Sequence, residues 1–266
     1  MKWLLPILII FLLSINSACK KSEEGTIPSG NVIFTVQHYV DGTILHENKL
    51  IYTNAAGNQY LITEVKYFIS DITFYYQGRA RTMVRQGKDI FYIDEDIPET
   101  KILRFSEKIP AGSYDSITFI FGIPEAKNKS FMFVNPPEVN MAWPQVLGGG
   151  YHYMMMNGKW KDRSEVIQPF NFHLGIGQLY HGNNYNTDSI YAFIQNYFTV
   201  SLPESGFTLR DGETLTFNLQ MNIDSWFNTP HIYDHNFWGG AIMQNQAALE
   251  MVRENGWNVF SITPKR

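Results

Sequence analysis

Side chains that can bind a metal ion are concentrated between residues 138 and 181 of this chain. His152 is followed closely by Met154 and Met156. If residues 152–156 form a strand, these three side chains share one face, because successive residues of a strand alternate between faces. Imidazole and thioether together form a soft ligand set, which favours copper(I) over magnesium or calcium. The alternative is that the methionines and aromatic residues of this stretch only fill a β-sheet core.

Two further histidines lie in stretches with the alternation of a strand. His38 comes near the end of residues 31–40, on the same face as three apolar side chains. His173 lies in residues 166–174, on the face opposite to the apolar one. A histidine at the end of an apolar face is either a hydrogen-bonded core residue or a ligand, so His38 has both interpretations.

A third group of histidines lies near the C-terminus. His231 and His235 are four residues apart, and on a helix this spacing would place both rings on one face, where they could share a metal. The neighbouring Pro230 and the many aromatic residues favour a loop instead. No H-E-x-x-H motif is present, which excludes a zincin.

The elements that must position these residues are predominantly strands. Short stretches with strand-like alternation are separated by turn signals, and only residues 241–254 have a helical stripe. We therefore predict an all-β fold, an antiparallel β-sandwich with one C-terminal α-helix. The parity of the apolar residues in the long stretch 60–76 changes after Ile69, which predicts a bulge near Ser70 and Asp71.

The N-terminus has the pattern of a lipoprotein signal. Lys2 precedes an apolar run over residues 3–15, and Cys19, the single cysteine of the chain, follows shortly after. The run is shorter than the roughly 20 residues that a membrane-spanning helix needs. We predict a signal peptide over residues 1–18, acylation of Cys19, a flexible tether over 19–30 and one domain over 31–266. Lipidation would leave no free thiol for a disulfide or a thiolate metal site.

Composition and motifs exclude several classes of function. The formal net charge is −4, so the chain has no basic footprint for nucleic acid. The sequence contains no G-x-S-x-G nucleophile motif, no phosphate-binding P-loop and no Rossmann glycine motif. We therefore expect a binding protein rather than an enzyme.

Taken together, several segments resemble the MbnP-like family, copper-binding proteins first recognised beside methanobactin genes and common as Bacteroidetes lipoproteins. The resemblance covers most of the chain after the tether. It depends on FTVQHYVDG (34–42), YTNAAGN (52–58), YFISD (67–71), IPAGSYDS (109–116), MAW (141–143), GY (150–151), FHLG (172–175), WFNTPH (226–231) and MQNQ (243–246).

The resemblance implies a β-sandwich that binds copper outside the cytoplasm. In such proteins a partner dihaem, peroxidase-like enzyme oxidises a tryptophan to kynurenine, and the modified residue joins histidines as a copper ligand. Trp143 and His173 occupy the family-like positions here. We expect His38 and His173 to be the best ligands; the further candidates are His152, His231 and His235.

The predicted acylation of Cys19 would anchor the protein to a membrane, and we expect this to be the outer membrane, on its periplasmic face or at the cell surface. The hypothesis that competes with copper binding is a cell-surface module that binds carbohydrate or peptide, in which exposed aromatic residues form a stacking platform. The aromatic residues that suggest it are Trp226, Phe227, Tyr233, Phe237 and Trp238.

Overall fold

A computed structural model describes residues 27–76, 79–82, 89–182, 185–202 and 204–265. The signal peptide, Cys19 and most of the tether lie outside these residues. Within them, no helix is long and apolar enough to cross a membrane.

Two β-sheets face each other, as the alternation of apolar residues predicts. The smaller sheet has the order β18 (Phe260–Pro264), β17 (Thr214–Asn222), β1 (Ser29–Val40) and β2 (Thr43–Ile44), and β7 (Ile102–Arg104) and β8 (Ile109–Pro110) also pair with β1. The strand pairs of this sheet are antiparallel, except that β1 and β17 run parallel.

The larger sheet is built around the long strand β4 (Gln59–Tyr76). Its order is β12 (Ile167–Leu174), β11 (Met154–Lys161), β4, β10 (Ser116–Phe121) and β15 (Phe198–Leu202), and β3 (Tyr52–Thr53), β5 (Arg79–Thr82) and β6 (Ile90–Asp94) also pair with β4. The pairing register with β10 shifts between Ser70 and Thr73, and Asp71 has a φ of 50°. The predicted bulge is therefore confirmed.

Aromatic side chains fill the space between the two sheets. Phe34 of β1 is fully buried, and its ring contacts Phe74 of β4 and Phe217 of β17 at centroid distances of 6.3 and 6.0 Å. Burying such a side chain stabilises the fold by about 1.5–3 kcal/mol. The inward face of β1 is the one that the sequence predicts, with His38 buried at its end.

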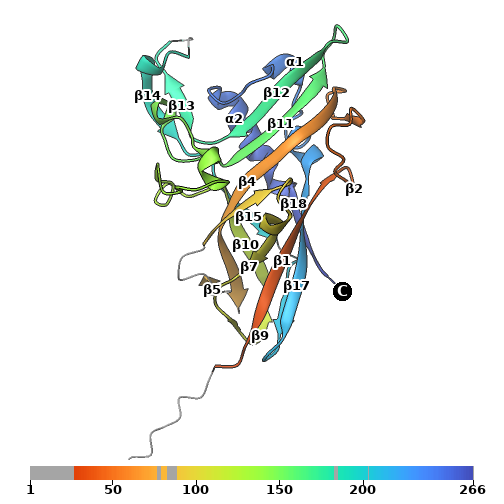
Figure 1. Cartoon of the computed structure of the whole chain (residues 1–266), viewed down its shortest axis with the longest axis vertical. Helices are drawn as coiled ribbons and strands as arrows, with labels where there is room; N and C mark the ends of the chain where they lie inside the picture. The colour runs from red at the N-terminus through yellow and green to blue at the C-terminus, as the bar shows by residue number, and fades with distance from the viewer. Residues whose placement is uncertain (1–26, 77–78, 83–88, 183–184, 203, 266) are drawn as a thin grey trace, which may run out of the picture.

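The remaining elements gather mainly at one end of the molecule, around β11 and β12 (Figure 1). The hairpin of β13 (Gly177–Tyr180) and β14 (Ile190–Ile194) projects there, whereas β9 (Gly112–Tyr114) and β16 (Phe207–Leu209) pair at the other end. The helices are α1 (His235–Trp238) and α2 (Gln246–Asn255). Short 3-10 turns span Pro98–Lys101, Glu138–Met141, Gln145–Leu147, Thr187–Ser189, Ile223–Phe227 and Gly256–Asn258.

Two predicted elements have different bounds in the structure. The helix begins at Gln246 instead of residue 241, because Asn245 caps it by accepting a hydrogen bond from the Ala248 N–H. The sequence also predicts one strand over residues 190–202, and the structure splits it into β14 and β15. Between them Asn196 is fully buried, and its amide bonds the Gly175 carbonyl and Gln246.

Candidate metal centre

Two histidines from separate segments meet beside a buried tryptophan. The ring centroids of His152 and His173 are 5.0 Å apart, with the planes at 87°. The indole ring of Trp143 lies against His152 at a centroid distance of 4.6 Å. Trp143 and His152 are buried and His173 is half-buried. Three of the predicted site residues thus form one cluster, which we call the His152–His173 site.

The irregular segment before β11 positions His152 and Trp143. The Trp143 N–H donates to the Gly150 carbonyl, and the His152 N–H donates to the Met141 carbonyl. The three glycines at 148–150 make the reversal between them, with φ angles of 115°, 69° and 75°. Glycine adopts such left-handed angles without steric cost. The segment therefore folds back on itself and carries His152 over β12.

The prediction that His152 shares a face with Met154 and Met156 is wrong. β11 begins at Met154, so His152 is not part of the strand. His152 instead contacts His173, whose cross-strand partner is Met155. Met154 and Met156 point into the core and are fully buried. This agrees with the alternative interpretation, in which these methionines only fill the core.

One ring nitrogen of His152 has no partner. Nδ1 lies 3.0 Å from the Met141 carbonyl oxygen, and because a carbonyl only accepts, Nδ1 carries the proton. Nε2 is then the unprotonated nitrogen. It is buried and has no hydrogen-bond partner within the described part of the chain. A buried lone pair without a hydrogen-bond donor costs free energy of folding. Such a lone pair is expected where the nitrogen is a metal ligand.

Both imidazoles are neutral at physiological pH. Burial lowers the pKa of His152 to about 4, although the backbone of Met141 and of Ala142 acts in the opposite direction. Burial, and to a smaller extent the neighbouring His152, lowers the pKa of His173 to about 3. Metal binding requires neutral imidazole, so neither ring has to lose a proton first.

The indole of Trp143 is held in place on two sides. Its Nε1–H donates to the Leu147 carbonyl at 3.0 Å. A Cβ atom at Gly175 would lie only 2.5–2.8 Å from three atoms of the six-membered ring. Gly175, which directly follows β12, thus permits the chain to approach the indole closely.

Gly175→Ala is therefore expected to displace the Trp143 ring and to destabilise the protein by roughly 1–3 kcal/mol, the usual cost of overpacking. Urea unfolding and tryptophan fluorescence would measure both effects. Gly57→Ala is the control for the fluorescence change, since a Cβ atom at Gly57 would meet nothing within 4 Å, although the positive φ of 80° makes alanine strained there. A fluorescence change of the same size in the control would contradict the expectation.

Comparison with known proteins identifies the fold and the family. The sequence profile of the MbnP family matches residues 29–244. The chain belongs to the MbnP family. Its fold is also similar to that of MbnP from Methylosinus trichosporium, with a TM-score of 0.56 and 12% sequence identity, over 89% of this chain and 99% of that chain. No curated protein matches the sequence. The resemblance inferred from the sequence is thereby confirmed.

In this MbnP-family chain His38 lies away from the His152–His173 site. Its Nδ1 is 2.5 Å from the Glu95 carboxylate and its Nε2 is 3.0 Å from the Tyr67 hydroxyl. Tyr67 pairs with Met154 and so points inward, whereas Met155 and His173 point outward. The expected pairing of His38 with His173 is therefore not observed. His38 therefore hydrogen-bonds from one sheet to the other. Of the two interpretations of His38, this is the hydrogen-bonded core residue and not the ligand.

His38→Leu should cost about 2–4 kcal/mol of unfolding free energy and leave metal affinity unchanged. The variant leaves the fully buried Tyr67 hydroxyl unpaired, and such a group alone costs about 1–3 kcal/mol. Urea unfolding would measure the loss. Adding Tyr67→Phe should recover part of it, because no hydroxyl then remains to be satisfied. A loss of metal affinity in His38→Leu would show that His38 does more than hydrogen-bond between the two sheets.

The C-terminal histidines do not meet each other or the site. His231 is half-exposed and pairs with Glu254. His235 is fully buried among five aromatic rings, the nearest being Phe170 at 4.5 Å. His235 begins α1, while His231 precedes it in an irregular segment, so their spacing of four does not place them on one helical face.

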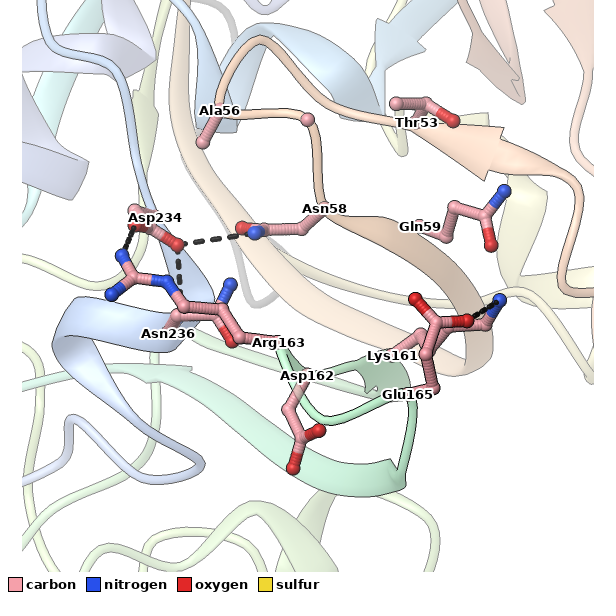
Figure 2. Close-up of a pocket in the computed structure, with 11 residues that line it drawn as sticks. Thr53, Ala56, Asn58, Gln59, Lys161, Asp162, Arg163, Glu165, Asp234 and Asn236 are labelled. Carbon is pink, nitrogen blue, oxygen red and sulfur yellow. Dashed lines mark hydrogen bonds and ion pairs between the residues drawn. The ribbon is translucent and has the colours of Figure 1, made fainter.

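The aromatic platform expected for a carbohydrate or peptide module is not formed. Trp226, Phe227 and Tyr233 are buried in the core, and only Phe237 of the five residues is largely exposed. A polar cavity of about 480 Å³ does lie near these residues, at the β11–β12 turn (Figure 2). Four of its charged residues already pair with each other, Arg163 with Asp234 and Lys161 with Glu165. The Asp162 carboxylate accepts hydrogen bonds from Gln168 and from the Ser164 and Val166 N–H groups.

Proposed function

We propose that this MbnP-family protein binds copper through His152 and His173, with Trp143 beside them. The observation that carries the proposal is the buried, unpartnered Nε2 of His152 next to a second neutral imidazole. No group of three or more His, Cys, Asp or Glu side chains converges within the described residues. The site therefore offers two nitrogen ligands, and any further ligand must be a soft donor such as a thioether.

The residues present fit a copper ion better than a hard cation. Two imidazoles that share an ion at about 2.0–2.1 Å, at a roughly tetrahedral angle, have ring centroids about 5 Å apart. The observed separation is 5.0 Å. Met155, the cross-strand partner of His173, adds a thioether on the same face. Neutral imidazole and thioether donors select copper(I) over magnesium and calcium.

A modified Trp143 would complete the site. We propose, from the family resemblance, that a dihaem partner oxidises Trp143 to kynurenine, whose polar groups could bind the metal. Bound copper would supply a soft centre that exchanges one electron. The protein itself would hold or pass on the ion without catalysing a reaction, and it would not bind nucleic acid.

Metal titration of the purified protein tests this proposal. We expect one equivalent of copper(I) to bind at pH 7 in competition with a chromophoric chelator, and zinc to bind more weakly. A peptide mass spectrum across Trp143 would show whether the indole is oxidised. Absence of copper uptake at micromolar metal, with Trp143 in either form, would refute the proposal.

We also propose that acylation of Cys19 anchors the protein to the outer membrane and keeps its domain outside the cytoplasm. The support is the apolar run that precedes this single cysteine. Cys19→Ser is expected to abolish incorporation of labelled palmitate and to move the protein from the membrane to the soluble fraction. Lys20→Ser is a matched control and should leave both unchanged. Labelling that persists in Cys19→Ser would exclude this anchor.

A further inference from the structure

The outward face of β4, β11 and β12 carries a hydrogen-bonded chain of side chains that ends on His173. The register places Asn157 of β11 opposite Glu64 of β4, and Met155 opposite both Lys66 and His173. His173 and Asn157 are therefore diagonal neighbours on one face. Long side chains reach each other across this diagonal.

Three contacts link these residues. Lys66 pairs with the Glu64 carboxylate. The other oxygen of that carboxylate accepts a hydrogen bond from the Asn157 amide nitrogen. The Asn157 amide oxygen lies 2.8 Å from Nε2 of His173. Of the four linked residues, Lys66, Glu64, Asn157 and His173, only His173 is part of the proposed ligand set.

The contacts determine which nitrogen of His173 carries its proton. A carboxylate only accepts hydrogen bonds, so the NH₂ group of Asn157 must face Glu64 and its oxygen must face His173. An amide oxygen also only accepts, so Nε2 of His173 must be the N–H donor. The opposite tautomer would require the amide to turn, which would place its oxygen against the carboxylate oxygen. Nδ1 of His173 is therefore the nitrogen with the free lone pair.

We infer that Glu64 and Asn157 are positioning residues that hold His173 in the Nε2–H tautomer and leave Nδ1 free to bind the metal. The Met141 carbonyl does the converse for His152, where Nδ1 is protonated and Nε2 is free. The two ligands thus use opposite nitrogens. The inference depends on the proposed function for its effect on metal affinity, but the tautomer itself is a property of the metal-free protein.

Nitrogen NMR of the metal-free, ¹⁵N-labelled protein at pH 7 tests the tautomer directly, because protonated and bare ring nitrogens resonate far apart. Wild-type protein should show His173 protonated at Nε2 and His152 protonated at Nδ1. Asn157→Leu should give a mixture of His173 tautomers and lower the copper(I) affinity 10–100-fold, the usual effect of removing a residue that orients a ligand.

Two further variants separate orientation from packing. Asn171→Leu is the matched control, since Asn171 pairs with Asn157 across the strands but is exposed. It should leave both readouts unchanged. The double variant Glu64→Gln with Asn157→Asp exchanges the two groups. The carboxylate is then at position 157, where it accepts hydrogen bonds from Nε2–H of His173 and from the new amide at position 64. This variant should restore the Nε2–H tautomer and most of the affinity.

Wild-type His173 protonated at Nδ1, or Asn157→Leu behaving like Asn171→Leu, would overturn the inference. The expected tautomers without any copper binding would refute the proposed function and support the positioning role. Copper binding by a protein whose His173 is protonated at Nδ1 would support the proposed function and refute the positioning role.

Discussion

His173→Ala is expected to lower the copper(I) affinity of this protein by more than about 100-fold. The variant removes one of two nitrogen ligands, and loss of a residue that only orients a ligand already costs 10–100-fold. No other histidine contacts His152, so the structure offers no replacement within the described residues. His152→Ala should have an effect of the same size. Competition with a chromophoric copper(I) chelator at pH 7 would measure both.

The matched control for this prediction is His231→Ala. His231 is a half-exposed histidine that pairs with Glu254 and does not contact the site. Its replacement should leave the copper affinity within twofold of wild type. An equal loss in His231→Ala would indicate nonspecific binding by surface histidines, and an unchanged affinity in His173→Ala would exclude the site.

The sandwich was predictable because its strands are regular. The alternation of β1 and β4 shows which side chains point inward, and the change of parity after Ile69 locates the bulge. Side-chain period and turn residues are local properties, so the sequence alone displays them. The strand break at Asn196 was not predictable, because the buried amide of Asn196 there bonds residues that are distant in the chain.

The candidate site was predicted only in part. Trp143 and His173 were identified from the family resemblance, and the structure places them together with His152. The face of His152 was predicted wrongly because the strand period does not apply to an irregular segment. His38 was given two interpretations, and the structural partner that decides between them, Glu95, is 57 residues away.

Asn157 and Glu64 were not predicted to have any role. Their side chains meet across a strand pair whose members are 93 residues apart in sequence. The spacing of Met155 and Asn157 shows that they share a face, but only the register of β4 against β11 adds Glu64. Register depends on tertiary pairing, and no local pattern in a single sequence reports it.

His235 has the most unusual environment among the described histidines. Its ring is fully buried, both ring nitrogens have no hydrogen-bond partner there, and rings of Tyr60, Trp160, Phe170, Phe227 and Tyr233 surround it. Burial lowers the pKa of His235 to about 3 despite the adjacent Asp234 carboxylate. In the unfolded chain the pKa would be about 6.5. Below pH 6.5 the unfolded state therefore binds a proton that the folded state excludes.

His235→Phe should therefore make this protein markedly more resistant to acid. Stability from the neutral ring is complete above pH 6.5 and is lost as the pH falls toward 3, because proton binding then favours unfolding. At 1.36 kcal/mol per unit, the wild type should lose about 3 kcal/mol through this residue by pH 4. Urea unfolding between pH 7 and pH 4 would show a smaller loss in the variant, while His152 and His173 contribute equally to both proteins. Parallel stability curves for the two proteins would mean that His235 takes up a proton in the folded state, and that its aromatic surroundings stabilise the cation instead of excluding it.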